Sequence, residues 1–271
     1  YFSEVSINGE YNGTYQISEK IEEDNHRVNV GNNGFLIEID QLNRMTNDDV
    51  YVESYENLYN IKFPETNINS DLYNYFKNFI LNFEKKLFSN EFKDPINGYR
   101  NLIDLESLVD WYLINEINKN GDKILKTGAF FSSVFITLKP NGKIKFGPLW
   151  DYDLAFGNIT SDNNDKPSGF WLKDYSSWFK QMFKDQYFVE MVKKRFSYFY
   201  SNKKEIIDFS NKLSKKLTKS RIENEKVWKT LGKSPPPGLP IGFNTFEEEQ
   251  NHLNNWIIIR FEWLKNEIEK L

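Results

Sequence analysis

Apolar residues recur every three or four positions over residues 105–120, and this spacing predicts a helix with one buried face. The residues of that face are Leu105, Leu108, Val109, Tyr112, Leu113 and Ile117. The pattern stops at Asn120-Gly121-Asp122. Glycine is common just past a helix end, so Asp122 is expected in the loop that follows.

Two strand-like runs come next, at residues 129–138 and 142–150, joined by Lys139-Pro-Asn-Gly142. Asn-Gly between two such runs is a strong signal for a β-hairpin. A hairpin would return the chain to the point where it left the helix. Asp151 and Asp153, which directly follow the second run, are therefore expected close to Asp122.

The spacing of Asp151 and Asp153 allows two interpretations. In an extended segment, side chains two residues apart point the same way, so the two carboxylates could converge on one hard cation. They could instead form an acidic turn in which Asp side chains accept backbone N–H bonds and Gly157 closes the loop. A loop carboxylate, a hairpin and a second carboxylate is the order found in protein-kinase-like phosphotransferases.

A second hairpin is predicted at the start of the chain. Asn8-Gly9 and Asn12-Gly13 are flanked by strand-forming residues, and the ribbon would end at Glu19-Lys20. Glu19 has two interpretations. It could be a surface charge at the end of an edge strand, or it could clamp a phosphate-binding lysine as a glutamate does in kinase-like folds.

The remaining pattern predicts a single α+β domain with a β-rich part at 1–66, helices plus the hairpin at 67–160 and a helical part at 161–271. Amphipathic helices are expected at 72–88 and within 171–200, where the aromatic stripe indicates core. The lysine clusters at 203–204 and 212–219 are expected to be the solvated face of a helix. A proline-rich loop at 234–240 precedes a last helix, which a Thr245/Glu248 capping box would open.

Composition excludes several kinds of chemistry. With no Cys there is no disulfide, thiol nucleophile or Cys-type zinc site. The only histidines, His26 and His252, lack ligand spacing. A net charge of −4 disfavours nucleic acid as a partner, and no apolar run is long enough to predict a membrane span.

Three blocks of the chain resemble the CotH kinase family, named for a spore coat protein. They are the helix end at 115–122, the segment Gly147-Pro-Leu-Trp-Asp-Tyr-Asp-Leu-Ala-Phe-Gly-Asn158, and the early segment at 7–21. The resemblance implies an atypical protein kinase that transfers phosphate from ATP to serine residues of a protein, using magnesium or a related divalent ion. It also implies a kinase-like fold, with a small β-rich lobe packed on a larger helical lobe, and a spore-coat or bacterial cell-surface location.

By the same resemblance, Asp122 matches the catalytic-loop carboxylate and Asp151 the metal-binding one, with Asp153 as a second ligand. Trp150 would offer an aromatic face to the nucleotide base. The resemblance also favours the clamping interpretation of Glu19.

The chain departs from the family pattern in two places. Members carry an Arg-Gly segment and a Lys-rich strand before the first hairpin, whereas this chain begins at Tyr1 within a strand-like run. We therefore expect a fragment that lacks part of the nucleotide site. Thr127 stands where kinases place an asparagine for a second metal, and the candidates to replace it are Asn120, Ser132 and Ser133.

Two other functions stay open from the sequence. One is a non-catalytic coat or scaffold module, in which these acids only cap turns. The other is a glycoside hydrolase with Trp150 and Trp171 as sugar platforms, which requires two carboxyl groups separated by about 5–5.5 Å or about 6.5–9.5 Å.

Overall fold

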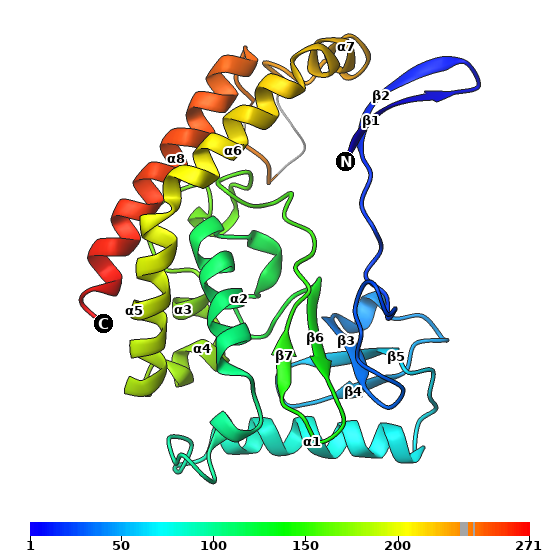
Figure 1. The fold of residues 1–271 in the computed structure, drawn as a ribbon, viewed down its shortest axis with the longest axis vertical. Helices are drawn as coiled ribbons and strands as arrows, with labels where there is room; N and C mark the ends of the chain where they lie inside the picture. Colours follow the sequence, from blue (N-terminus) through cyan, green and yellow to red (C-terminus); the bar gives the residue numbers. More distant parts are fainter. Residues whose placement is uncertain (234–237, 241) are drawn as a thin grey trace. The chain divides into compact units, whose positions relative to one another are not determined.

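The computed structural model describes residues 1–233, 238–240 and 242–271. Within these ranges the chain is α+β, with eight α-helices and two antiparallel sheets (Figure 1), and this confirms the expected fold class. Most of the predicted proline-rich loop lies outside the described residues. The division of one domain at residues 66 and 160 stays a prediction.

Backbone contacts divide the chain into two units. The sheet unit comprises residues 21–154, 170–196 and 271. The hairpin–helix unit comprises residues 1–20, 155–169 and 197–270. Each unit is described by itself.

The sheet unit is built on five antiparallel strands in the order β4-β5-β3-β6-β7. The central strand β3 has the sequence Phe-Leu-Ile-Glu-Ile-Asp, and four of its apolar side chains are fully buried. Consecutive apolar residues point to opposite faces of a strand, so both faces of β3 are covered. The strand bounds are β3 Phe35–Asp40, β4 Tyr51–Glu53, β5 Leu58–Phe63, β6 Val134–Leu138 and β7 Ile144–Phe146.

Helix α1 (Asp71–Leu87) packs beside β3 and β5 (Figure 1). The Ser70 side chain caps its start by accepting from the Tyr73 amide. The ring of Phe76 lies 5.4 Å from that of Phe35 on β3 and 6.1 Å from that of Tyr59 on β5, measured between centroids. This confirms the amphipathic helix predicted at 72–88.

Helix α2 (Leu105–Asn118) is the helix predicted from the first apolar stripe, but it ends two residues early. Its C-cap is Lys119, whose φ of 48° is left-handed. Gly121, expected to be the stop signal, instead begins a 3-10 turn. The left-handed residue turns the chain at once, which places Asp122 on that turn and not in an open loop.

The hairpin predicted after α2 is present as β6 and β7, although both strands are shorter than expected. Ile136 pairs with Phe146 and Leu138 with Ile144. The flanking residues 129–133 and 147–150 are not strand. The second of these segments leads directly into Asp151.

The aromatic stripe at 171–200 forms core, as predicted. It folds as α3 (Leu172–Tyr175), α4 (Ser177–Met182) and α5 (Gln186–Ser201), the last of which runs into the hairpin–helix unit. Trp178 lies against Phe83 of α1, with ring centroids 4.8 Å apart. The buried residues of these helices include Leu172, Trp178, Phe179, Met182, Phe188, Val189, Val192 and Phe196.

In the hairpin–helix unit, β1 (Phe2–Ile7) and β2 (Glu10–Gln16) form the predicted antiparallel ribbon, although it ends at Gln16 and not at Glu19-Lys20. Helix α7 (Thr218–Trp228) contacts it, because Asn224 accepts from the Thr14 amide at 2.9 Å and the Trp228 indole donates to the Asn12 carbonyl at 3.0 Å. A Cβ at Gly13 would lie 2.6 Å from both of these helix side chains, so only glycine fits there.

Helices α6 (Lys203–Lys216) and α8 (Phe246–Ile268) of this unit also agree with the predictions from the sequence. On α6 the lysines from 212 onward are exposed, as expected for a solvated face. Helix α8 begins with the predicted Thr245/Glu248 capping box. Among the helices that the structure describes, none is both long and apolar enough to cross a membrane.

Candidate active site: three aspartates beside a buried lysine

Asp122 lies on the short 3-10 turn Gly121–Lys123 that follows α2. The fully buried Asn120 caps this turn, since its Oδ1 accepts from the Asp122 amide at 3.1 Å. The Asn120 carbonyl in turn accepts from the indole of Trp171 at 2.8 Å. The backbone that carries Asp122 is therefore held from two sides.

Asp151 and Asp153 lie on the segment that follows β7, but that segment is not extended. The strand ends at Phe146, and Asp151 has a left-handed φ of 59°. The expectation that Asp151 and Asp153 lie on an extended segment is therefore wrong. Two hydrogen bonds to the Asp122 turn bring the segment into place instead: Asn120 Nδ2 donates to the Asp151 carbonyl at 2.8 Å, and the Gly121 amide donates to the Leu154 carbonyl at 3.0 Å.

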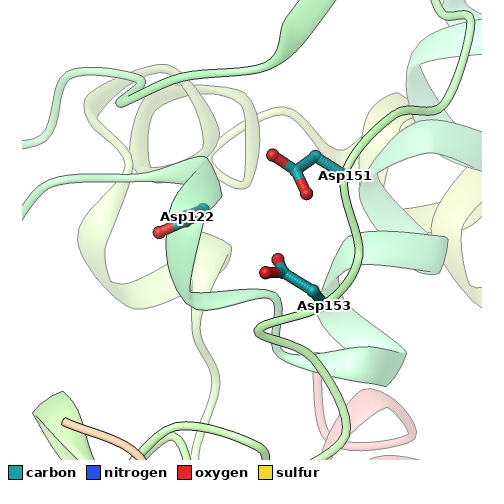
Figure 2. A group of neighbouring side chains, drawn as sticks. All are labelled: Asp122, Asp151 and Asp153. Atoms are coloured by element: carbon teal, nitrogen blue, oxygen red, sulfur yellow. The ribbon is translucent and has the colours of Figure 1, made fainter. Parts of the chain in front are cut away.

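The three carboxylates gather in one place. Each of Asp122, Asp151 and Asp153 has an oxygen within 4.8 Å of the corresponding oxygens of the other two. Figure 2 shows Asp151 and Asp153 projecting from the segment after β7 into the space beside Asp122, which lies on the turn after α2. Asp122 is partly buried, while Asp151 and Asp153 are exposed. The sequence predicted this proximity.

The three carboxylates repel one another, so added positive charge would stabilise the group. Burial raises the pKa of Asp122, and the charge of Asp153 raises it further, while Lys123 partly offsets both. Burial also raises the pKa of Asp153, followed by the charge of Asp151. Carboxylate oxygens are the ligands that magnesium prefers, and opposite ligands of that ion are about 4 Å apart. The donor set and its spacing therefore fit a hard divalent cation.

Lys123, which sequence reasoning missed, is buried beside the aspartates, with only 1% of its surface exposed. Its ammonium donates to the carbonyls of Ser133, Trp150 and Asp151 at 3.3, 2.8 and 3.1 Å. Burial lowers its pKa to about 8, against the opposing effect of the nearby acids, with Asp151 foremost. The one signal in the sequence was a lysine next to a candidate catalytic acid and before the apolar Ile124.

The polar candidates for a second metal ligand differ in where they lie. Thr127 is exposed in a turn closed by a hydrogen bond from Gly128 to Leu125. Ser133 donates to Asp151 Oδ2 at 3.4 Å, and the Ser132 hydroxyl lies 3.5 Å from the Asp122 carbonyl. The structure therefore brings the two serines, and not Thr127, to the aspartates.

The aromatic candidates are engaged with the protein. Trp150 is half-buried and packs against the cluster of Ile21, Leu36 and Phe135. Trp171 is buried among the residues of the core, so it is not available as a sugar platform. Glu19 is exposed and belongs to the hairpin–helix unit. The nucleotide-binding roles of Glu19 and Trp150 stay predictions.

The family comparison agrees with the three sequence blocks. The family model described as CotH kinase protein matches residues 1–264. The chain belongs to this family. Membership of the CotH kinase family indicates a kinase-like function, and it implies ATP and a divalent metal in general terms. Among curated proteins, no match to the chain was found.

Proposed function

We propose that the protein is an ATP-dependent protein kinase that transfers phosphate to serine residues of a coat or surface protein. The observation that carries the proposal is the cluster of three aspartates within a chain of the CotH kinase family. Phosphoryl transfer depends mainly on positioning and on neutralising charge, so carboxylates and a divalent ion are sufficient without His or Cys.

We assign the roles of the three acids from the family resemblance, and their surroundings support the assignment. Asp122 would orient the acceptor hydroxyl and take its proton as the serine oxygen attacks the γ-phosphorus and ADP leaves. Its raised pKa suits a proton acceptor. Asp151 and Asp153 would hold the divalent ion, which when bound neutralises charge on the phosphates.

Two further roles come from the family resemblance. Trp150 would offer part of its ring to the adenine base, and Glu19 would fix a phosphate-binding group. Asn120 is a candidate for the cofactor-binding asparagine of kinases, but both ends of its side chain bind the protein itself, at the Asp122 turn and at the Asp151 carbonyl. We therefore assign Asn120 the role of positioning the acids relative to each other.

The direct test is to incubate the full-length protein with ATP, a divalent cation and serine-rich candidate proteins, then to locate phosphate by mass spectrometry. Asp151→Ala should abolish labelling from radioactive ATP without unfolding the protein. Glu53→Gln, an exposed acid on β4, serves as the control and should label normally. Labelling that survives in Asp151→Ala would remove this residue from the mechanism.

The two proposed roles can be separated by measurement. Asp122→Asn should keep the affinity for ATP with a divalent ion but lower the rate of transfer by about a thousandfold. Asp151→Asn should lose binding of the ion itself. Calorimetry that detects no heat with ATP and magnesium in the full-length protein would instead favour the non-catalytic scaffold.

A further inference from the structure

A hollow of about 430 Å³ lies in the sheet unit, between the turn that joins β4 to β5 and the last two turns of α1. Its size is within the range of ligand pockets. The turn contributes Tyr55 and Glu56, and the helix side contributes Leu81, Glu84, Lys85 and Phe88. The positions 81, 84, 85 and 88 follow helical spacing, so they form one face of α1.

The rim of this hollow is apolar and open to solvent. Tyr55 is 95% exposed, Phe88 42% and Leu81 37%. Leu81 and Phe88 therefore leave apolar surface uncovered on a helix whose other apolar face is in the core. Apolar surface gathered around a depression is typical of a contact site for another molecule.

Two carboxylates line the same hollow, and among the described residues neither forms an ion pair with a cation. Glu84 Oε1 accepts from Tyr59 at 2.7 Å, Ser54 at 3.0 Å and Asn57 at 3.4 Å. Within the described part of the chain, no donor reaches its Oε2. Glu56 accepts from the Ser177 hydroxyl through Oε2 alone.

The surroundings of Glu56 and Glu84 disfavour their charged forms. Burial raises the pKa of both Glu56 and Glu84, and the charge of Glu84 raises that of Glu56 further. Lys85 also lines the hollow, but it forms no ion pair with either acid in the described residues. A partly buried carboxylate is costly without a counter-ion, so an entering cation would be stabilised.

We propose that this hollow binds an arginine side chain of a partner protein, presented in a segment with apolar residues on either side of the arginine. A guanidinium offers several N–H donors in one plane for Glu56 and Glu84, and it stacks favourably on aromatic rings such as Tyr55 and Phe88. The flanking apolar residues would cover Leu81. The site is separate from the aspartate cluster and does not depend on phosphoryl transfer.

The probe is a five-residue peptide with a central arginine between two leucines, titrated into the chain by calorimetry and mapped by nuclear magnetic resonance. The matched probe replaces arginine by citrulline, which has nearly the same shape and no charge. The arginine peptide should bind about tenfold more tightly than the citrulline peptide, and shifts should centre on Tyr55, Glu56 and residues 81–88.

Three substitutions sharpen the test. Glu56→Gln keeps an acceptor for Ser177 and should weaken binding of the arginine peptide by about tenfold. Glu53→Gln, close in sequence but outside the hollow, should leave binding unchanged. Lys85→Met should strengthen binding, because it removes a competing cation.

The opposite results would overturn the proposal. Equal affinity for the arginine and citrulline peptides would show that the carboxylates do not select a cation. Weaker binding of the arginine peptide in Lys85→Met would contradict the expected competition between Lys85 and the entering guanidinium. The proposal also fails if no binding is seen up to about 1 mM peptide, or if the shifts centre on another surface.

Discussion

The side-chain amide of Asn120 donates a hydrogen bond of 2.8 Å to the backbone carbonyl of Asp151. The same side chain accepts from the Asp122 amide. One buried residue therefore connects the turn after α2 to the segment after β7. The distance between the proposed catalytic acid and the proposed metal ligand depends on this connection.

Asn120→Ala removes both bonds, which deprives the Asp122 amide of its acceptor and leaves Lys123 as the remaining donor to the Asp151 carbonyl. We expect a loss of about 1–3 kcal/mol in the free energy of unfolding and a fall of about tenfold in affinity for manganese with an ATP analogue. Denaturant unfolding and calorimetry measure the two. Asn101→Ala, which changes an exposed residue at the end of the 3-10 turn Tyr99–Asn101, should leave metal affinity unchanged. Unaltered metal binding in Asn120→Ala would leave Asn120 with a purely structural role.

Lys123→Met should lower stability because three carbonyls lose their common donor. Methionine has a similar length but offers no N–H, so we expect the free energy of unfolding to fall by about 3 kcal/mol. The control is Lys139→Met on the exposed hairpin turn, which should change stability by less than about 0.5 kcal/mol. If urea unfolding gives equal values for the two variants, the buried ammonium does not stabilise the site.

Glu84 makes stability depend on pH. Burial raises its folded-state pKa, so the folded chain binds more protons than the unfolded chain between the two pKa values. Its stabilising contribution is present below the unfolded pKa of about 4.3 and is lost as the pH rises through the folded pKa. Glu84→Gln keeps an oxygen acceptor for Tyr59 and cannot ionise.

The stability of Glu84→Gln relative to the unchanged chain should therefore increase from about pH 4 to about pH 7. Unfolding by denaturant at a series of pH values measures this difference. Glu56 also has a raised pKa, so Glu56→Gln provides a second curve that should have the same sign. A difference that stays constant with pH would contradict the assignment to Glu84.

Arg100 neutralises a buried carboxylate in the core of the sheet unit. Its Nε donates to Asp185 Oδ2 at 2.7 Å, the other arm of the guanidinium binds Oδ1, and Tyr99 also donates to Asp185. Arg100→Met would leave the Asp185 carboxylate buried without its counter-ion, so we expect the free energy of unfolding to fall by about 3–5 kcal/mol.

An exposed ion pair supplies the comparison for Arg100→Met. Breaking the pair between Lys226 and Glu223 by Lys226→Met should cost less than about 0.5 kcal/mol. Thermal unfolding of the two variants side by side measures the contrast. Similar costs would mean that water reaches Asp185 in the folded protein.

Local signals predicted much of the fold. The stripe at residues 105–120, the Asn-Gly turn before β7 and the Thr245/Glu248 capping box each act within a few residues, and each matches the structure. The closeness of Asp122 to the other two acids was also predictable, because a hairpin returns the chain to its starting point.

Other features depend on contacts that no local pattern records. The left-handed backbone at Lys119 and Asp151 is uncommon for residues with a side chain, and distant hydrogen bonds hold the second of these in place. The burial of Lys123 requires three carbonyls from two separate segments. A lysine is normally assigned to the surface, so its neighbours in the sequence gave only a weak signal of its burial.

The two ends of the β6–β7 hairpin differ in how much change in sequence they should tolerate. Its base adjoins the aspartates, whereas its far end, Lys139-Pro-Asn-Gly142, consists largely of solvent-exposed residues. Exposed loop tips tolerate insertions. A short epitope placed between Pro140 and Asn141 would therefore allow the protein to be detected by an antibody while leaving the acids where they are.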